Sequence, residues 1–197
     1  IIYFMALTES YMLPLGISAP TFSLPDVING NQKKLISLKG KKGTLIIFMC
    51  NHCPYVIHLI EGILKTSIDL FEKGINTIAI SSNSIQSHPQ DGPEEMKKLA
   101  KLKNFPFPYL YDQTQEVAHS YKAACTPDFY LFNRQLNLVY RGRYDQSRPG
   151  NKIPVNGKDL HLAAELMLSN LPQADKQYPS MGCNIKWHFG NTPEERN

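Results

Sequence analysis

Cysteine is scarce in this chain of 197 residues, which contains only Cys50, Cys53, Cys125 and Cys183. Four cysteines are too few to hold a chain of this length together by disulfides, so its stability has to come from a hydrophobic core. With 42% hydrophobic residues, the chain has enough apolar side chains for one compact domain. No apolar run is long enough to cross a bilayer, so we expect no membrane partner.

Strong charge of one sign is also missing. The formal net charge is +4, and the lysines are scattered, with the longest basic cluster at residues 39–42. This distribution predicts a solvated surface and no nucleic-acid partner. Residues 1–4 precede Met5, a candidate natural start, and are either an upstream extension or not native; they are too few and too poor in basic residues for a signal peptide. We therefore expect a cytoplasmic protein in which residues 1–14 form an N-terminal extension.

One stretch joins a buried strand to a helix through a cysteine. Residues 45–49 form a short apolar run typical of a buried strand. From Pro54 to about Lys73, apolar residues recur at helical spacing. Because proline is favoured at the first helical position, Cys53 falls at or next to the N-cap, where unpaired N–H groups and the helix dipole favour a thiolate. The layout predicts a reactive cysteine.

The rest of the chain alternates strands and helices. Residues 22–24 and 34–38 are expected to form a hairpin around the Asn29-Gly30 turn. Residues 81–92, rich in small polar side chains, are expected to form a surface loop. Further strands are predicted at 75–80, 128–132 and 138–141, and further helices at 93–103, 113–121 and 158–171. This order predicts an α/β fold with a central sheet and helices on both faces.

Three landmarks carry a family resemblance. They are G-x-x-A-P-x-F-x-L at residues 16–24, F-M-C-N-H-C-P at 48–54, and C-T-P-D-F at 125–129. In this combination the chain resembles the thioredoxin-like superfamily and, within it, the AhpC/TSA (redoxin, peroxiredoxin-like) branch, here with an N-H-C-P-Y-V active-site turn. The resemblance implies a thioredoxin-like domain over residues 15–171, with a central mixed sheet, an N-terminal β-hairpin and a cis Thr126–Pro127 bond. Residues 172–197 are then expected to form a tail that packs on this domain.

The sequence departs from the family pattern in two ways. In thioredoxins the first cysteine of C-x-x-C caps the helix, whereas here the second, Cys53, takes that position. The peroxiredoxin pattern is P-x-x-x-[TS]-x-x-C together with a distant arginine. Here no proline, threonine or serine precedes Cys53 at those spacings, and Thr126 stands about where the arginine is expected. The resemblance therefore implies a thiol–disulfide oxidoreductase without a cofactor, served by an external thiol reductant. The alternatives are a peroxiredoxin-like thiol peroxidase, with an antioxidant role, and a non-catalytic binding module.

Each candidate site residue has an expected role. Cys53 is the expected nucleophile. Cys125 and Cys50 are preferred as resolving thiols over Cys183, which lies in the tail. Pro127 is expected to shape the loop that meets a disulfide or peroxide substrate, with His52 and Thr126 beside that substrate. A zinc site at Cys50, His52 and Cys53 is the rival interpretation, but no second ligand pair follows at similar spacing, so we expect no metal. The oligomeric state is left open.

Overall fold

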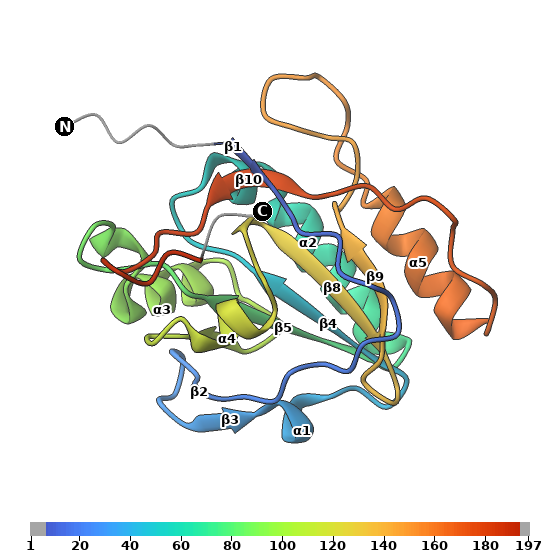
Figure 1. Ribbon diagram of the computed structural model, residues 1–197, viewed down its shortest axis with the longest axis horizontal. Helices are drawn as coiled ribbons and strands as arrows, with labels where there is room; N and C mark the ends of the chain where they lie inside the picture. Colours follow the sequence, from blue (N-terminus) through green and yellow to red (C-terminus); the bar gives the residue numbers. More distant parts are fainter. Residues whose placement is uncertain (1–6, 194–197) are drawn as a thin grey trace.

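A five-stranded mixed sheet forms the centre of the protein in the computed structural model, which describes residues 7–193 (Figure 1). Its strands are β4 (Gly43–Phe48), β5 (Ile75–Ser81), β6 (Tyr109–Tyr111), β8 (Asp128–Asn133) and β9 (Leu138–Gly142). They lie in the order β6-β5-β4-β8-β9. Strands β4, β5 and β6 are parallel, and β8 is antiparallel to both of its neighbours. The carboxyl ends of β4 and β5 therefore meet at one edge of the sheet.

Helices cover both faces of this sheet. They are α1 (Leu35–Leu38), α2 (Pro54–Glu72), α3 (Pro93–Leu102), α4 (Glu116–Ser120) and α5 (Lys158–Leu168), with a 3-10 helix over Pro89–Asp91. Side chains alternate along a strand, so Leu45 and Ile47 of β4 join the core with α2, α3 and α5. Ile46 and Phe48 join the opposite core with α1 and α4. The α/β fold predicted from the sequence is confirmed.

The N-terminal hairpin is present but shorter than predicted. Strand β2 (Ser23–Pro25) pairs antiparallel with β3 (Gln32–Lys34). The prediction of a strand over residues 34–38 is wrong, because Leu35–Leu38 form the short helix α1, in which Lys39 N–H donates to the Leu35 carbonyl at 2.9 Å. Only Leu35 of this helix is buried. A single anchoring side chain carries no periodic pattern that separates a helical turn from a strand.

A second, three-stranded sheet joins the two ends of the described chain. It consists of β1 (Leu7–Glu9), β10 (Met181–Asn184) and β7 (Cys125–Thr126), with β10 in the middle and antiparallel to both (Figure 1). A Cβ at Gly182 would lie 1.9 Å from the Thr126 carbonyl oxygen, so only glycine permits this close pairing. Cys183 is thus buried in a strand that pairs with β1 on one side and β7 on the other.

Two further sequence predictions need correction. Residues 81–92 are only partly a surface loop, because 81–84, 91 and 92 are buried and Pro89–Asp91 form the 3-10 helix. The helix predicted over 113–121 is reduced to α4, since Gln115 adopts a left-handed conformation, with φ of 64°, at its start. Between residues 7 and 193, none of the helices has the length and apolar character needed to cross a membrane. Residues 1–6 of the predicted extension lie outside the described part.

Candidate active site

Cys53 is the N-cap residue of α2, at the carboxyl end of β4. Pro54 is the first helical residue, and Ile57 N–H donates to the Cys53 carbonyl at 2.9 Å. The Cys53 side chain is 0% exposed, and its sulfur lies 3.1 Å from the carbonyl oxygen of Thr126 on β7. The sequence predicted this N-cap position because both the apolar strand and the helical periodicity are local patterns. The sulfur therefore lies near the unpaired N–H groups of the first helical turn.

Two further thiols contact the Cys53 sulfur. Hydrogen bonds from Cys183 and then from Cys50 lower the pKa of Cys53, although burial acts in the opposite direction. The Thr126 carbonyl also opposes ionisation, because only protonated Cys53 can donate to it. The side chain of Thr126 and the backbone of Cys183 add hydrogen bonds that favour the thiolate, so the net direction is a lowered pKa. The same hydrogen bonds with Cys53, followed by burial, raise the pKa of Cys50 and of Cys183. These opposite directions favour Cys53 over Cys50 and Cys183 as the thiol that ionises.

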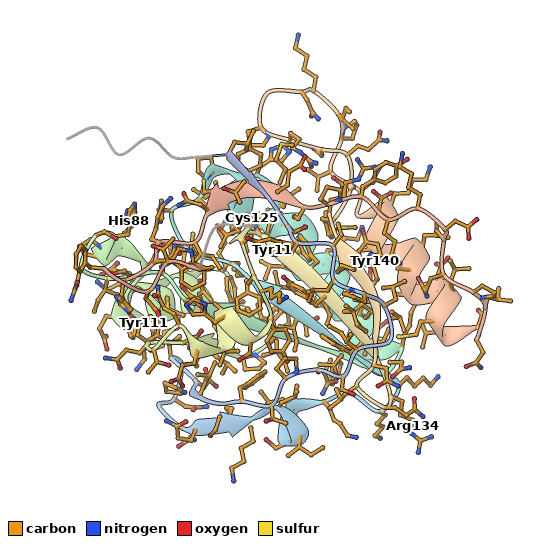
Figure 2. All side chains as sticks on the ribbon, in the orientation of Figure 1. Tyr11, His88, Tyr111, Cys125, Arg134 and Tyr140 are labelled. Carbon is orange, nitrogen blue, oxygen red and sulfur yellow. The ribbon has the colours of Figure 1, made fainter. Side chains whose placement is uncertain are left out.

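Cys125 lies close to this group but points elsewhere. Cys125 is labelled in Figure 2; it follows α4 in the chain, and its backbone pairs with Asn184 of β10. Its sulfur lies 3.9 Å from the Pro127 carbonyl oxygen, and burial, followed by the charge of Asp128, raises its pKa. The Thr126–Pro127 bond is cis, as the family resemblance implied. Cys125 and Pro127 therefore border the site, but Cys183 takes the place beside Cys53 that the sequence interpretation gave first to Cys125.

His52 and Thr126 lie next to Cys50. The Thr126 hydroxyl oxygen is 3.5 Å from the Cys50 sulfur, and His52 Nδ1 is 3.8 Å from it. His52 directly precedes Cys53 in the sequence, but the sulfur that its ring contacts is that of Cys50. The His52 ring also stacks on His88, with ring centroids 4.7 Å apart. Through these contacts Cys50 is linked to Thr126 of β7 and, by way of His52, to His88 in the segment that follows β5.

Asp91 is the site residue that sequence reasoning missed. It is 0% exposed, and its Oδ1 accepts hydrogen bonds from the N–H groups of Asn51, at 2.8 Å, and His52, at 3.3 Å. Its Oδ2 accepts from Asn83 at 2.8 Å and pairs with His52 Nδ1 at 2.5 Å. Burial would raise the pKa of Asp91, but the hydrogen bonds from His52 and Asn83 outweigh it and lower the pKa. Asp91 therefore anchors the turn before Cys53.

The zinc interpretation can be tested on these contacts. Within residues 7–193 the atoms that could ligate a metal together belong to Cys50, His52 and Asp91, all within 4.8 Å of one another, so the set differs from the predicted one. Both carboxylate oxygens of Asp91 already accept hydrogen bonds, and His52 Nε2 has no partner, although metal-bound histidines normally donate from their second nitrogen. The arrangement fits a hydrogen-bonded anchor better than a metal centre.

Replacing Asp91 with asparagine should lower the free energy of unfolding by about 2–3 kcal/mol at pH 7, because charge-assisted hydrogen bonds to the turn are lost. The lowered pKa of Asp91 means that its stabilisation is complete above the unfolded value of about 3.9 and is lost as the pH falls through the folded value. Wild type should therefore lose more stability between pH 5 and 3 than the variant. Urea unfolding at both pH values measures this difference.

The exposed Asp175 provides a matched control for this measurement. Asp175→Asn should stay within about 0.5 kcal/mol of wild type, as is usual for surface substitutions. An Asp91→Asn protein that is as stable as this control at pH 7 would contradict the anchoring role of Asp91.

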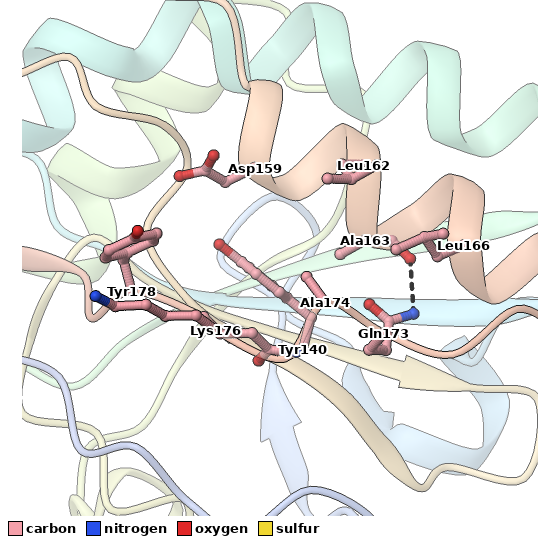
Figure 3. Close-up of a pocket in the computed structure, with 10 residues that line it drawn as sticks. Tyr140, Asp159, Leu162, Ala163, Leu166, Gln173, Ala174, Lys176 and Tyr178 are labelled. Carbon is pink, nitrogen blue, oxygen red and sulfur yellow. Dashed lines mark hydrogen bonds between the residues drawn. The ribbon is translucent and has the colours of Figure 1, made fainter.

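A separate cavity of about 150 Å³ lies between α5 and residues 173–178 (Figure 3). Tyr140 and Tyr178 line it, and Gln173 Nε2 donates to the Ala163 carbonyl across it at 3.1 Å. None of the cysteines is among the residues that line this cavity. It therefore belongs to the packing of the tail on α5 and not to the cysteine site.

Comparisons with known proteins point to one family. The model of the AhpC/TSA family matches residues 15–141. A structure described as an uncharacterized conserved protein from Geobacillus kaustophilus is 49% identical, with a TM-score of 0.91 over 93% of this chain and 97% of that one. A hypothetical protein from Sinorhizobium meliloti 1021 is 40% identical, with a TM-score of 0.90 over 93% and 100% of the two chains.

More distant structures share the fold. The thioredoxin domain of a thiol-disulfide oxidoreductase from Bacteroides vulgatus has a TM-score of 0.56 at 22% identity, over 66% of this chain and 88% of that one. A peroxidoxin from Mycobacterium tuberculosis has a TM-score of 0.58 at 15% identity, over 81% and 98% of the two chains. The search of curated proteins gave no match. These similarities confirm the thioredoxin-like fold.

Proposed function

The chain belongs to the AhpC/TSA family, and from this premise we propose that it is a thiol–disulfide oxidoreductase with Cys53 as the attacking thiolate and Cys183 as the resolving thiol. One observation carries the proposal: the helix-capping Cys53 sulfur is hydrogen-bonded to two other thiols, and its pKa is lowered. A lowered pKa supplies the reactive thiolate at neutral pH. A thiol already in contact with it supplies the second sulfur that disulfide exchange requires.

The exchange proceeds in two steps with these sulfurs. The Cys53 thiolate attacks one sulfur of a substrate disulfide, forming a mixed disulfide and releasing the other substrate half as a thiolate, which takes a proton from solvent. Cys183 then loses its proton and attacks the Cys53 sulfur. This step forms a Cys53–Cys183 disulfide and releases the second substrate half as a thiol. An external dithiol reduces the protein disulfide and completes the cycle. The helix N-terminus stabilises Cys53 as a thiolate whenever it attacks or leaves.

The positions of the arginines favour disulfide over peroxide reduction. Arg141 bonds to Gln177, Arg143 to Asp159, and Arg148 to the carbonyls of Asp145 and Ser147. Arg134, labelled in Figure 2, follows β8 next to Asn133, which pairs with Gly43 at the opposite end of β4 from the site. Three of these four arginines of the described chain are therefore engaged or placed elsewhere, whereas the charge of Arg148 reaches Cys125 at the border of the site. In peroxide reduction, negative charge develops on the leaving oxygen, and a donor such as arginine stabilises it. Loss of one such donor can slow a reaction by about a hundredfold or more.

A thiol peroxidase is the second candidate, and the burial of Cys53 favours it, because a hydroperoxide is small enough to reach a buried sulfur. One preparation assayed for both activities separates the two functions. We expect Cys53-dependent reduction of small disulfides and peroxide reduction that is slower than in dedicated peroxidases by about a hundredfold or more. Rapid peroxide turnover that disappears in Cys53→Ser, with no disulfide reduction, would make the peroxidase the correct function.

A further inference from the structure

A groove of about 480 Å³ adjoins the cysteine site. The loop over residues 84–88 forms one wall, and residues 184–192, which follow β10, form the other. It meets the site at two points. His88, labelled in Figure 2, lines the groove and stacks on His52. Asn184 lines it and directly follows Cys183. The groove therefore adjoins the site through these two residues, although none of the cysteines is among the residues that line it.

Lys186 provides a cation in this groove. Its backbone is held on both sides, since its N–H donates to Asn83 Oδ1 at 2.8 Å and its carbonyl accepts from Ser84 N–H at 2.7 Å. Its ammonium donates to Asn184 Oδ1 at 2.6 Å. None of the residues found to line the groove is acidic. The ammonium therefore faces a groove without a carboxylate to neutralise it.

The charge of Lys186 reaches both the groove and the sulfurs. It contributes to lowering the pKa of His88, after burial and the charge of His52. It also opposes the rise that the hydrogen bond to Cys53 and burial cause in the pKa of Cys183. An anion bound by Lys186 would therefore lie within electrostatic range of the resolving thiol.

Aromatic side chains complete the groove. Trp187 lines it and packs with its ring centroid 4.4 Å from that of His119, which holds the indole in place. The side chain of Phe189 also lines the groove and is fully exposed. The combination of one cation, polar loop groups and aromatic surface suits a small organic anion. The volume falls within the range of about 300–1,000 Å³ typical of small-molecule sites.

We propose that this groove binds low-molecular-weight disulfides that carry carboxylates, and that these are the substrates of the Cys53–Cys183 exchange. The inference rests on the proposed function and names its substrate class. The carboxylate pairs with Lys186, which places the substrate disulfide next to β10. Cys53 and Cys183 are at most 4% exposed, which favours a small disulfide over one on the surface of a folded protein. The bonds that form and break are those of the two-step exchange between the substrate disulfide, Cys53 and Cys183.

Lys186→Gln tests this inference in a steady-state assay with two probes, oxidised glutathione as a carboxylate-bearing disulfide and 2-hydroxyethyl disulfide as a neutral one. We expect KM for oxidised glutathione to rise about tenfold with kcat unchanged, because one charged contact of ground-state binding is lost. KM for the neutral probe should not change. Lys101→Gln, at an exposed position on α3, is the matched control and should behave as wild type with both.

A binding measurement separates failure of this inference from failure of the proposed function. Trp187 is the only tryptophan, so its fluorescence in a Cys53→Ser background reports binding of oxidised glutathione without reaction. Binding that is weakened by Lys186→Gln supports the groove even if neither probe is reduced, in which case only the proposed function fails. Reduction of both probes with equal KM in wild type and Lys186→Gln, or no binding in the titration, would overturn the groove assignment.

Discussion

Replacing Cys53 with serine is expected to lower kcat/KM for disulfide reduction by about a thousandfold or more, because the attacking thiolate is removed. Serine is close to cysteine in size, so the fold should be retained. Cys125→Ser is the matched control, since the Cys125 sulfur is buried and directed at the Pro127 carbonyl. It should keep activity within a few-fold of wild type. Loss of activity in both variants to the same extent would contradict the role of Cys53.

The same two variants can be compared by alkylation. Because hydrogen bonds from Cys183 and Cys50 lower the pKa of Cys53, its reaction with iodoacetamide should persist well below the usual thiol pKa of about 8.5. The raised pKa values of Cys50 and Cys183 keep those thiols protonated and slow over the same range. The low-pH phase should be absent in Cys53→Ser and present in Cys125→Ser. A low-pH phase of equal size in both would show that another thiol is the ionised one.

Replacing Cys183 with serine is expected to trap the mixed disulfide between Cys53 and half of the substrate. The first exchange step needs only Cys53. Release of the second substrate half needs another thiol that already contacts the Cys53 sulfur, as Cys183 does. Turnover should fall by about a hundredfold, since an external thiol has to replace a positioned one. Intact-mass spectrometry after addition of substrate disulfide should show one substrate half bound to the protein.

Cys50→Ser is the matched control for this experiment, because Cys50 is the other thiol that hydrogen-bonds to Cys53. It should not accumulate the adduct. Accumulation in Cys50→Ser and not in Cys183→Ser would assign the resolving role to Cys50 and contradict the role proposed for β10.

The parts of the site that could be predicted from the sequence are local. Strand β4 and helix α2 each show their own period of apolar residues, so the position of Cys53 between them followed from neighbouring residues. The turn at Pro127 followed from the family resemblance. Cys183 and Asp91 reach the site through long-range contacts. Strand β10 has four residues, including Gly182, and carries no alternating pattern that predicts its pairing with Thr126.

One feature of the sequence could have identified Asp91 as a site residue. It lies in the segment that follows β5, and the carboxyl ends of neighbouring parallel strands meet at one edge of a sheet, where β4 also delivers the turn before Cys53. An acidic residue in that segment is therefore a candidate partner for His52. The small polar side chains around it indicated a surface loop instead, because composition does not show which residues of a loop turn inward.

The disulfide pairing of the oxidised protein tests the central claim most directly. Protein treated with one equivalent of a small disulfide, alkylated and digested, can be mapped by mass spectrometry of its linked peptides. If Cys53 and Cys183 are the exchanging pair, the main product is a peptide linking these two residues, and both Cys50 and Cys125 are recovered alkylated. A main product that links Cys53 to Cys125, or a pair that excludes Cys53, would contradict it.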